Sequence, residues 1–138
     1  MHTLPKTLIA LTLMTACTAI AQEQEQEQEQ EQEQEQEQAQ DITLMLGDYH
    51  FVPDTFEVNA GQPVRLTLTN TDRITPHNFI LKDETAGLNI DTSVSAGKAT
   101  TVEFTPTTPG SYTFYCSKKL PFMKSHQEKG MEGTLTVK

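Results

Sequence analysis

The sequence has few cysteines, few basic residues and no long apolar run. Of its two cysteines, Cys17 lies near the N-terminus, so we expect no disulfide framework and a single thiol, Cys116, in the folded domain. The apolar run at residues 7–16 is far shorter than the roughly 20 residues that cross a bilayer, so no transmembrane span is expected. The 10 Lys and Arg, against 19 Asp and Glu, are not concentrated enough to suggest nucleic-acid binding.

The N-terminal segment is typical of an export signal. Lys6 precedes the short apolar run, and Ala19-Ile20-Ala21 provides small residues where a signal peptidase cleaves. We therefore predict a signal peptide at residues 1–21 and a periplasmic location for the mature protein. Residues 13–17 also resemble a bacterial lipoprotein signal. Two outcomes stay open: Cys17 is removed with the signal, or it carries a lipid anchor that tethers the protein to a membrane.

A Gln-Glu repeat follows the signal and holds most of the negative charge. Residues 1–40 carry one base and eight acids, net −7, whereas residues 41–138 carry nine bases and eleven acids, net −2. The repeat has no apolar side chain to bury and its charges repel one another, which favours an extended chain. We predict a low-complexity spacer at residues 22–40. Collection of metal cations by the repeat is a weaker alternative, because flexible carboxylates present no preset geometry.

Residues 41–138 alternate apolar and polar side chains in short runs, of which residues 64–69 are the clearest. Such alternation is typical of strands with one buried face. Turn-forming residues such as Asn59-Ala60-Gly61 separate the runs. We predict a single all-β domain, a Greek-key β-sandwich of about seven to eight strands, with a short helix at most between residues 120 and 127. The predicted strands are residues 42–46, 55–58, 64–69, 77–81, 99–105, 112–116 and 133–137.

Four side chains of this domain form a soft set of metal ligands. Taken singly, a cysteine in a β-protein is more often an inert core residue, a histidine at a strand start a polar edge residue, and a methionine near a chain end a core residue. Taken together, two imidazoles, one thiolate and one thioether are the ligands of blue-copper electron-transfer sites. The four candidates are His77, Cys116, His126 and Met131.

Several short motifs of the domain follow one another in the order of a known family. They are Phe51-Val52-Pro53, Phe56-Glu57-Val58, Gly61, Val64, Asn70, His77-Asn78, Pro109-Gly110-Ser111-Tyr112, Cys116 and Met131-Glu132-Gly133. Through them, residues 41–138 resemble the cupredoxins of the plastocyanin and azurin superfamily. The resemblance implies one copper ion, cycling between Cu(I) and Cu(II), on the four candidate ligands. It also implies that Asn78 and Ser117 join the first histidine strand to the cysteine loop and orient the ligands.

The sequence departs from the family pattern between the cysteine and the second histidine. Family members usually place two to four residues there, whereas nine separate Cys116 from His126. The insertion leaves Met123 as an alternative to Met131 for the thioether ligand. A longer loop could also open a coordination position and produce a green or red copper site instead of a blue one. The remaining histidine of the domain, His50, is interpreted as a strand-end residue.

The first functional hypothesis is a one-electron carrier that is not an enzyme. We expect a monomer whose redox partner is a protein such as a cytochrome or a copper oxidase, with His126 as the exit for the electron. Residues 120–122 could form an apolar docking rim, and the surrounding lysines could attract an acidic partner. Lys118, Lys119, Lys124 and Lys129 surround this rim. The alternative hypothesis is a periplasmic copper-binding or copper-delivery protein in metal homeostasis.

Overall fold

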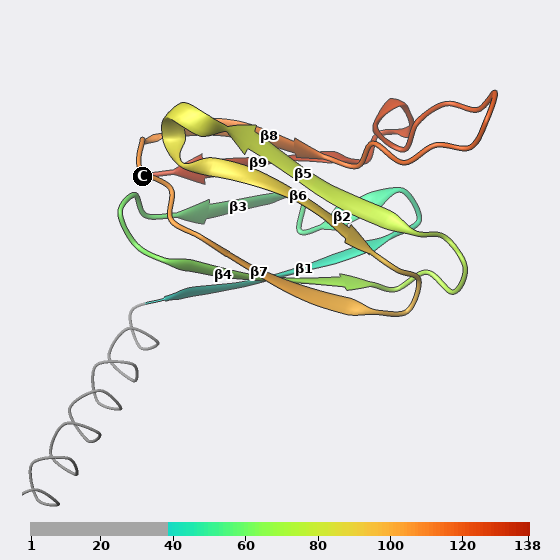
Figure 1. Ribbon diagram of the computed structural model, residues 1–138, viewed down its shortest axis with the longest axis horizontal. Coiled ribbons are helices and arrows are strands. Elements are labelled where there is room, and N and C mark those ends of the chain that lie inside the picture. Colours follow the sequence, from blue (N-terminus) through green and yellow to red (C-terminus); the bar gives the residue numbers. More distant parts are fainter. Residues whose placement is uncertain (1–38) are drawn as a thin grey trace, which may run out of the picture. The chain divides into compact units, whose positions relative to one another are not determined.

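The computed structural model of the chain describes residues 39–138. The predicted signal peptide, Cys17 and residues 22–38 of the predicted spacer lie outside the described residues. Residues 39–138 contain nine strands and two short 3-10 helices, which form a two-layered β-sandwich (Figure 1). In this described part of the chain, none of the helices has the length and apolar character needed to cross a membrane.

The first sheet has four strands in the order β2-β1-β4-β7. β1 runs parallel to β4, with Gln40 opposite Val64, and antiparallel to β2; β7 pairs antiparallel with the other side of β4. The strands are β1 (Gln40–Gly47), β2 (His50–Val52), β4 (Val64–Asn70) and β7 (Ala99–Phe104).

The second sheet has five strands in the order β3-β9-β8-β5-β6. β3 and β9 are parallel and the other neighbours are antiparallel. The strands are β3 (Thr55–Val58), β5 (His77–Asp83), β6 (Leu88–Val94), β8 (Gly110–Tyr115) and β9 (Glu132–Val137). Helix η1 (Glu84–Ala86) joins β5 to β6, and helix η2 (Gln127–Lys129) lies in the loop between β8 and β9.

The hydrophobic core lies between the two sheets. β4 shows why these residues form strands: its side chains alternate between buried and half-buried positions, so one face meets the core and the other does not. Neighbouring phenylalanine rings lie 5.1 to 5.9 Å apart at the centre of the core. Burial of each such ring stabilises the fold by about 1.5–3 kcal/mol. The rings belong to Phe51, Phe56, Phe79 and Phe114.

The predicted all-β sandwich is confirmed, and each of the seven predicted strands is present within a few residues. The prediction missed β6, although Leu88, Ile90 and Val94 are buried and their spacing is that of a strand. It also missed β2, which is too short to show a periodicity. The possible short helix in the last loop is present as helix η2 (Gln127–Lys129), which begins at the end of the expected range of residues 120–127.

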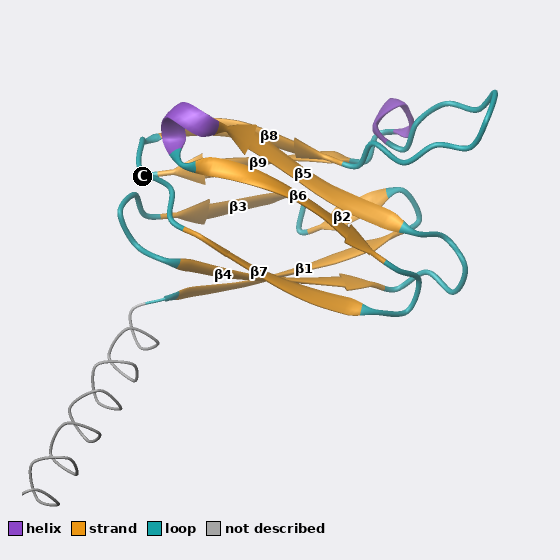
Figure 2. Cartoon of the chain, in the orientation of Figure 1, coloured by secondary structure: helices purple, strands orange, loops and turns teal. Residues whose placement is uncertain are grey.

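One end of the sandwich gathers three connections that matter for the site. They are the tight turn between β1 and β2, the β4–β5 loop (residues 71–76) and the β8–β9 loop (residues 116–131). Figure 2 shows helix η1 at the end where the chain terminates and helix η2 at the opposite end, where the β8–β9 loop projects beyond the sheets. His77 and His126, which are 49 positions apart in the sequence, are therefore brought together at one end of the domain.

Candidate metal centre

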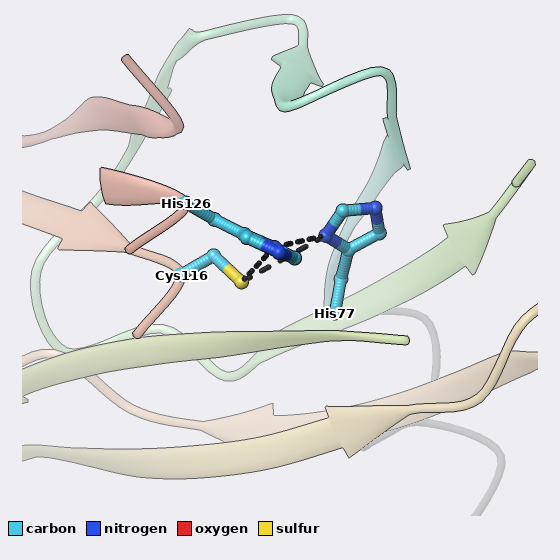
Figure 3. A group of neighbouring side chains, drawn as sticks. All are labelled: His77, Cys116 and His126. Carbon is cyan, nitrogen blue, oxygen red and sulfur yellow. Dashed lines mark hydrogen bonds between the residues drawn. The ribbon is translucent and has the colours of Figure 1, made fainter. Parts of the chain in front are cut away.

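Three of the predicted ligand side chains converge at this end of the sandwich (Figure 3). His77 Nδ1 lies 3.0 Å from His126 Nδ1, and Cys116 Sγ lies 3.4 Å from His126 Nδ1 and 3.8 Å from His77 Nδ1. His77 and Cys116 are fully buried and His126 is 6% exposed. Two nitrogen atoms and one sulfur atom thus face one another within 4.8 Å, away from water.

The start of β5 positions His77 beside the cysteine. β5 pairs with β8 at Ile80 and Leu81, and the ladder stops before the histidine. Beyond that point the backbone N–H of Asn78 donates to Cys116 Sγ at 3.3 Å. A sheet hydrogen bond is thereby replaced by a contact with the thiol, which places the sulfur next to the start of β5.

The side chain of Asn78 completes the junction with the cysteine segment. Its Nδ2 donates to Ser117 Oγ at 3.0 Å, and the backbone N–H of Ser117 donates to Asn78 Oδ1 at 2.9 Å. This reciprocal pair links the β5 start to the residue that follows Cys116. The two residues singled out in the sequence for such a link are therefore in direct contact.

The β8–β9 loop closes at its base, which explains how nine intervening residues still return His126 to Cys116. The backbone N–H of His126 donates to the carbonyl of Lys118 at 2.8 Å, and the N–H of Gln127 donates to the carbonyl of Cys116 at 3.0 Å. Residues 119–125 form an excursion above this closure. The additional length therefore projects outward and does not separate the two side chains.

The two candidate thioethers occupy different environments. Met131 is fully buried; its carbonyl accepts from the N–H of Cys116 at 3.1 Å, and its N–H donates to the carbonyl of His126 at 2.9 Å. Gly130, with φ of 100°, permits the sharp return of the chain to this residue. Met123 lies in the projecting part of the loop and is 51% exposed. The backbone thus ties Met131, and not Met123, to both neighbouring site residues.

Burial controls the protonation of the converging groups. It raises the pKa of the Cys116 thiol, although the backbone N–H of Asn78 opposes the rise. Burial, the adjacent His77 and the charge of Lys129 lower the pKa of His126, so this imidazole is neutral at neutral pH. Two imidazoles and a thiol become a soft ligand set when the thiol loses its proton. The chemistry of the donors therefore fits copper.

The structure adds two residues that the sequence gave no reason to select. Asp72 Oδ2 lies 2.8 Å from His77 Nε2, on the ring edge opposite the converging nitrogen. The Tyr49 ring packs edge-on against the His126 ring, with the ring centroids 4.8 Å apart. The Nζ atom of Lys129 lies over the Tyr49 ring, 4.0 Å from its centroid, in a cation–π contact. Tyr49 lies in the β1–β2 turn and Asp72 in the β4–β5 loop, and neither segment has a sequence periodicity that could reveal a role in the site. By contrast, His50 is an exposed strand-start residue whose Nδ1 contacts the carbonyl of Asp48, at 2.6 Å.

A cavity of about 260 Å³ opens above His126. Its walls come from the β4–β5 loop, the β8–β9 loop and Tyr49. Apolar walls are combined with a cationic rim, since three lysines line it. The lining residues are Tyr49, Ile74, Thr75, Pro76, Lys118, Lys119, Leu120, Met123, His126 and Lys129.

Comparisons with known proteins agree with this fold. Residues 7–137 match the family model described as a cupredoxin-like domain. Plastocyanin from Dryopteris crassirhizoma is 34% identical over 106 residues, which cover 67% of this chain and 92% of that protein. The chloroplastic plastocyanin minor isoform of Arabidopsis thaliana is also 34% identical, over 100 residues, but the match spans about half of it, 53%, and 67% of this chain. Auracyanin A, a "blue" copper protein from Chloroflexus aurantiacus, is similar in structure, with a TM-score of 0.57 at 23% identity, covering 72% of this chain and 99% of that one.

Proposed function

Because the chain belongs to the cupredoxin family, we propose that it binds one copper ion and acts as a one-electron carrier. The observation that carries the proposal is the buried convergence of His77 Nδ1, Cys116 Sγ and His126 Nδ1 within 4.8 Å. Met131, buried and tied by its backbone to Cys116 and His126, would supply the thioether. Copper bound there supplies the Cu(I)/Cu(II) couple.

The protein fixes the positions of the donor atoms and shields them from solvent. His77 and Cys116 are linked through Asn78, and the Lys118–His126 closure holds the other imidazole. A site whose donors are held before the metal arrives needs little rearrangement when its charge changes. The similarity of the chain to plastocyanins also supports a carrier.

We propose that the face above His126 binds an acidic redox partner, such as a cytochrome or a copper oxidase. Ile74 and Leu120 are 88% and 64% exposed beside the cavity, an unusual exposure for side chains of this size. Lys118, Lys119 and Lys129 provide positive charge on the same rim. Charge complementarity would steer an acidic protein to this face, and the apolar side chains would be buried on contact.

Copper delivery is the second candidate function. The projecting β8–β9 loop favours it, since a long loop around one ligand could open to release a metal (Figure 1). The burial of His126 and the backbone closure at Lys118 favour the carrier. For either function we propose an exported, periplasmic monomer. This location is supported by the signal-like residues 1–21 and leaves open a lipid anchor at Cys17.

The purified protein loaded with Cu(II) tests the proposal. We expect an intense visible thiolate-to-copper band and reversible one-electron redox chemistry. Cys116→Ser removes the thiolate and should abolish the band completely. Met123→Leu, a matched change in the exposed part of the loop, should leave it unchanged. A band that survives Cys116→Ser would contradict the site. A colourless protein that prefers Cu(I) and transfers it readily to a chelator would favour delivery.

A further inference from the structure

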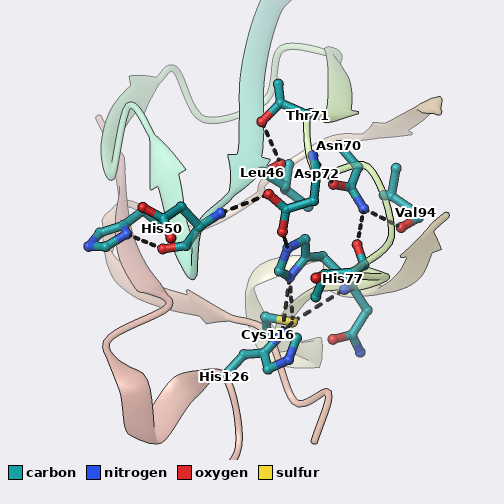
Figure 4. A network of polar contacts seen from close by, with 12 residues as sticks. Leu46, His50, Asn70, Thr71, Asp72, His77, Val94, Cys116 and His126 are labelled. Atoms are coloured by element: carbon teal, nitrogen blue, oxygen red, sulfur yellow. Dashed lines mark hydrogen bonds and ion pairs between the residues drawn. The ribbon is translucent and has the colours of Figure 1, made fainter. Parts of the chain in front are cut away.

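The carboxylate of Asp72 is placed between His77 and the backbone of the β1–β2 turn (Figure 4). Its Oδ2 lies 2.8 Å from His77 Nε2, and its Oδ1 accepts from the backbone N–H of Asp48 at 3.0 Å. Each oxygen therefore has one specific partner. The Asp72 side chain is 24% exposed, so this contact is substantially protected from water.

A buried asparagine holds Asp72 in this position. The backbone N–H of Asp72 donates to Asn70 Oδ1 at 3.0 Å. Asn70, 1% exposed, also donates through Nδ2 to the carbonyls of Thr75 and Val94 at 2.9 and 3.0 Å. The end of β4, the β4–β5 loop and the end of β6 are thus joined around one amide, and the carboxylate is aimed by a fixed backbone.

This contact determines which nitrogen of His77 carries the proton. A carboxylate only accepts hydrogen bonds, so a His77 ring with one proton carries it on Nε2 and has its lone pair on Nδ1. Nδ1 is the atom that faces Cys116 and His126. The ring is therefore held in the tautomer and orientation that a metal ligand requires.

The charge of Asp72 has a second consequence. An aspartate side chain carries a negative charge at neutral pH, and here it lies against the ring of His77. A negative group hydrogen-bonded to a ligand imidazole makes the ring a stronger electron donor. It also favours the metal state of higher positive charge, because opposite charges attract over this distance.

We propose that Asp72 is a positioning residue that holds His77 Nδ1 toward Cys116 and stabilises Cu(II) relative to Cu(I). The inference rests on the proposed copper function. It predicts that the site has a lower reduction potential with the carboxylate than without it. Asp72 does not touch the metal in this proposal, and acts on it through the imidazole of His77.

Asp72→Asn is the most specific test, because asparagine has nearly the same side-chain shape as aspartate but carries no charge. The amide has one oxygen for two donors, so either His77 Nε2 or the N–H of Asp48 then faces an NH₂ group. Removal of such outer partners typically weakens metal binding 10- to 100-fold. We expect Cu(II) affinity to fall about tenfold relative to Cu(I), which raises the reduction potential by about 59 mV. Asp72→Ala should have at least the same effect.

Asp41→Asn is the matched control. It removes one negative charge at the far end of β1, where Asp41 is 69% exposed and pairs with Arg65. The control should keep the wild-type potential and Cu(II) affinity. Nitrogen NMR of the metal-free protein provides an independent readout. His77 should be protonated at Nε2 in the wild type and in Asp41→Asn, and should show mixed or reversed tautomers in Asp72→Asn.

The outcomes separate this inference from the proposed function. If the wild type binds no copper and shows no visible band, the proposed function fails. If the wild type is coloured but Asp72→Asn keeps the potential, Cu(II) affinity and His77 tautomer, the inference is overturned. A loss of stability alone, with those three readouts unchanged, would give Asp72 a purely structural role and also overturn it.

Discussion

The two histidines of the candidate centre are held in contrasting ways. His77 lies at the start of a strand in the second sheet, is fully buried, and is contacted on its outer edge by Asp72. His126 lies in a loop, is held through its backbone, and forms part of the wall of a cavity. One histidine is supported by the fold, and the other connects the site with the surface. A carrier needs both: a fixed site and one ligand near the partner.

Replacing either histidine by glycine should have the largest effect on copper binding. The two variants should also differ in whether added imidazole can replace the missing ring. Both His77→Gly and His126→Gly should abolish the visible copper band, because each removes one of three converging donors. Added imidazole should restore the band in His126→Gly, since the cavity reaches that position. Added imidazole should not restore the band in His77→Gly, because the position of the missing ring is fully buried. Absorption titrations measure the loss of the band and its recovery with imidazole. Equal recovery in the two variants would contradict the proposed difference between the two histidines.

Asn70→Ala should have the next largest effect and tests the support beneath His77. It leaves the carbonyls of Thr75 and Val94 and the N–H of Asp72 without their partner. Loss of buried hydrogen bonds costs about 1–3 kcal/mol for each group left unsatisfied. We expect the free energy of unfolding to fall by at least about 2 kcal/mol in urea titrations. Asn89→Ala, at an exposed position of β6, is the matched control and should stay within about 0.5 kcal/mol of the wild type.

Charge reversal on the cavity rim should have the smallest effect. It tests the surface next to His126, where a partner protein would bind. The double variant Lys119→Glu and Lys129→Glu should slow electron transfer to an acidic partner about tenfold at low ionic strength. The difference should shrink as salt is added, because exposed charges are screened. Lys82→Glu, near the opposite end of β5, is the control. Stopped-flow kinetics at several salt concentrations measures the rate of electron transfer. Equal slowing by the control would contradict docking at this face.

The charge is also distributed unevenly along the sequence. Residues 1–40 carry a net charge of −7, whereas residues 41–138 carry −2 and place three lysines on the cavity rim. The total of −9 would predict a basic partner. The local distribution supports an acidic one, since a partner meets the charges around the exposed site and not their sum over the chain.

Much of the fold was predictable because it depends on local pattern. The alternation in residues 64–69 predicted β4, and the same reasoning found six further strands. β6 was equally detectable from Leu88, Ile90 and Val94 and was missed. The position of the helix in the β8–β9 loop was less predictable, because backbone closure at Lys118 and His126 determines the course of that segment, and such pairing has no local sequence pattern.

The sequence by itself determined the alternation that makes a β-sandwich and the identity of four soft donor side chains. It did so because burial periodicity and ligand chemistry are properties of individual residues and their neighbours. Only the tertiary structure decided that residues 119–125 project outward while His126 returns to Cys116. The tertiary structure also decided that Asp72, an ordinary turn residue in the sequence, meets His77 at 2.8 Å. Such contacts depend on how distant loops meet at one end of two sheets, and no short segment encodes them.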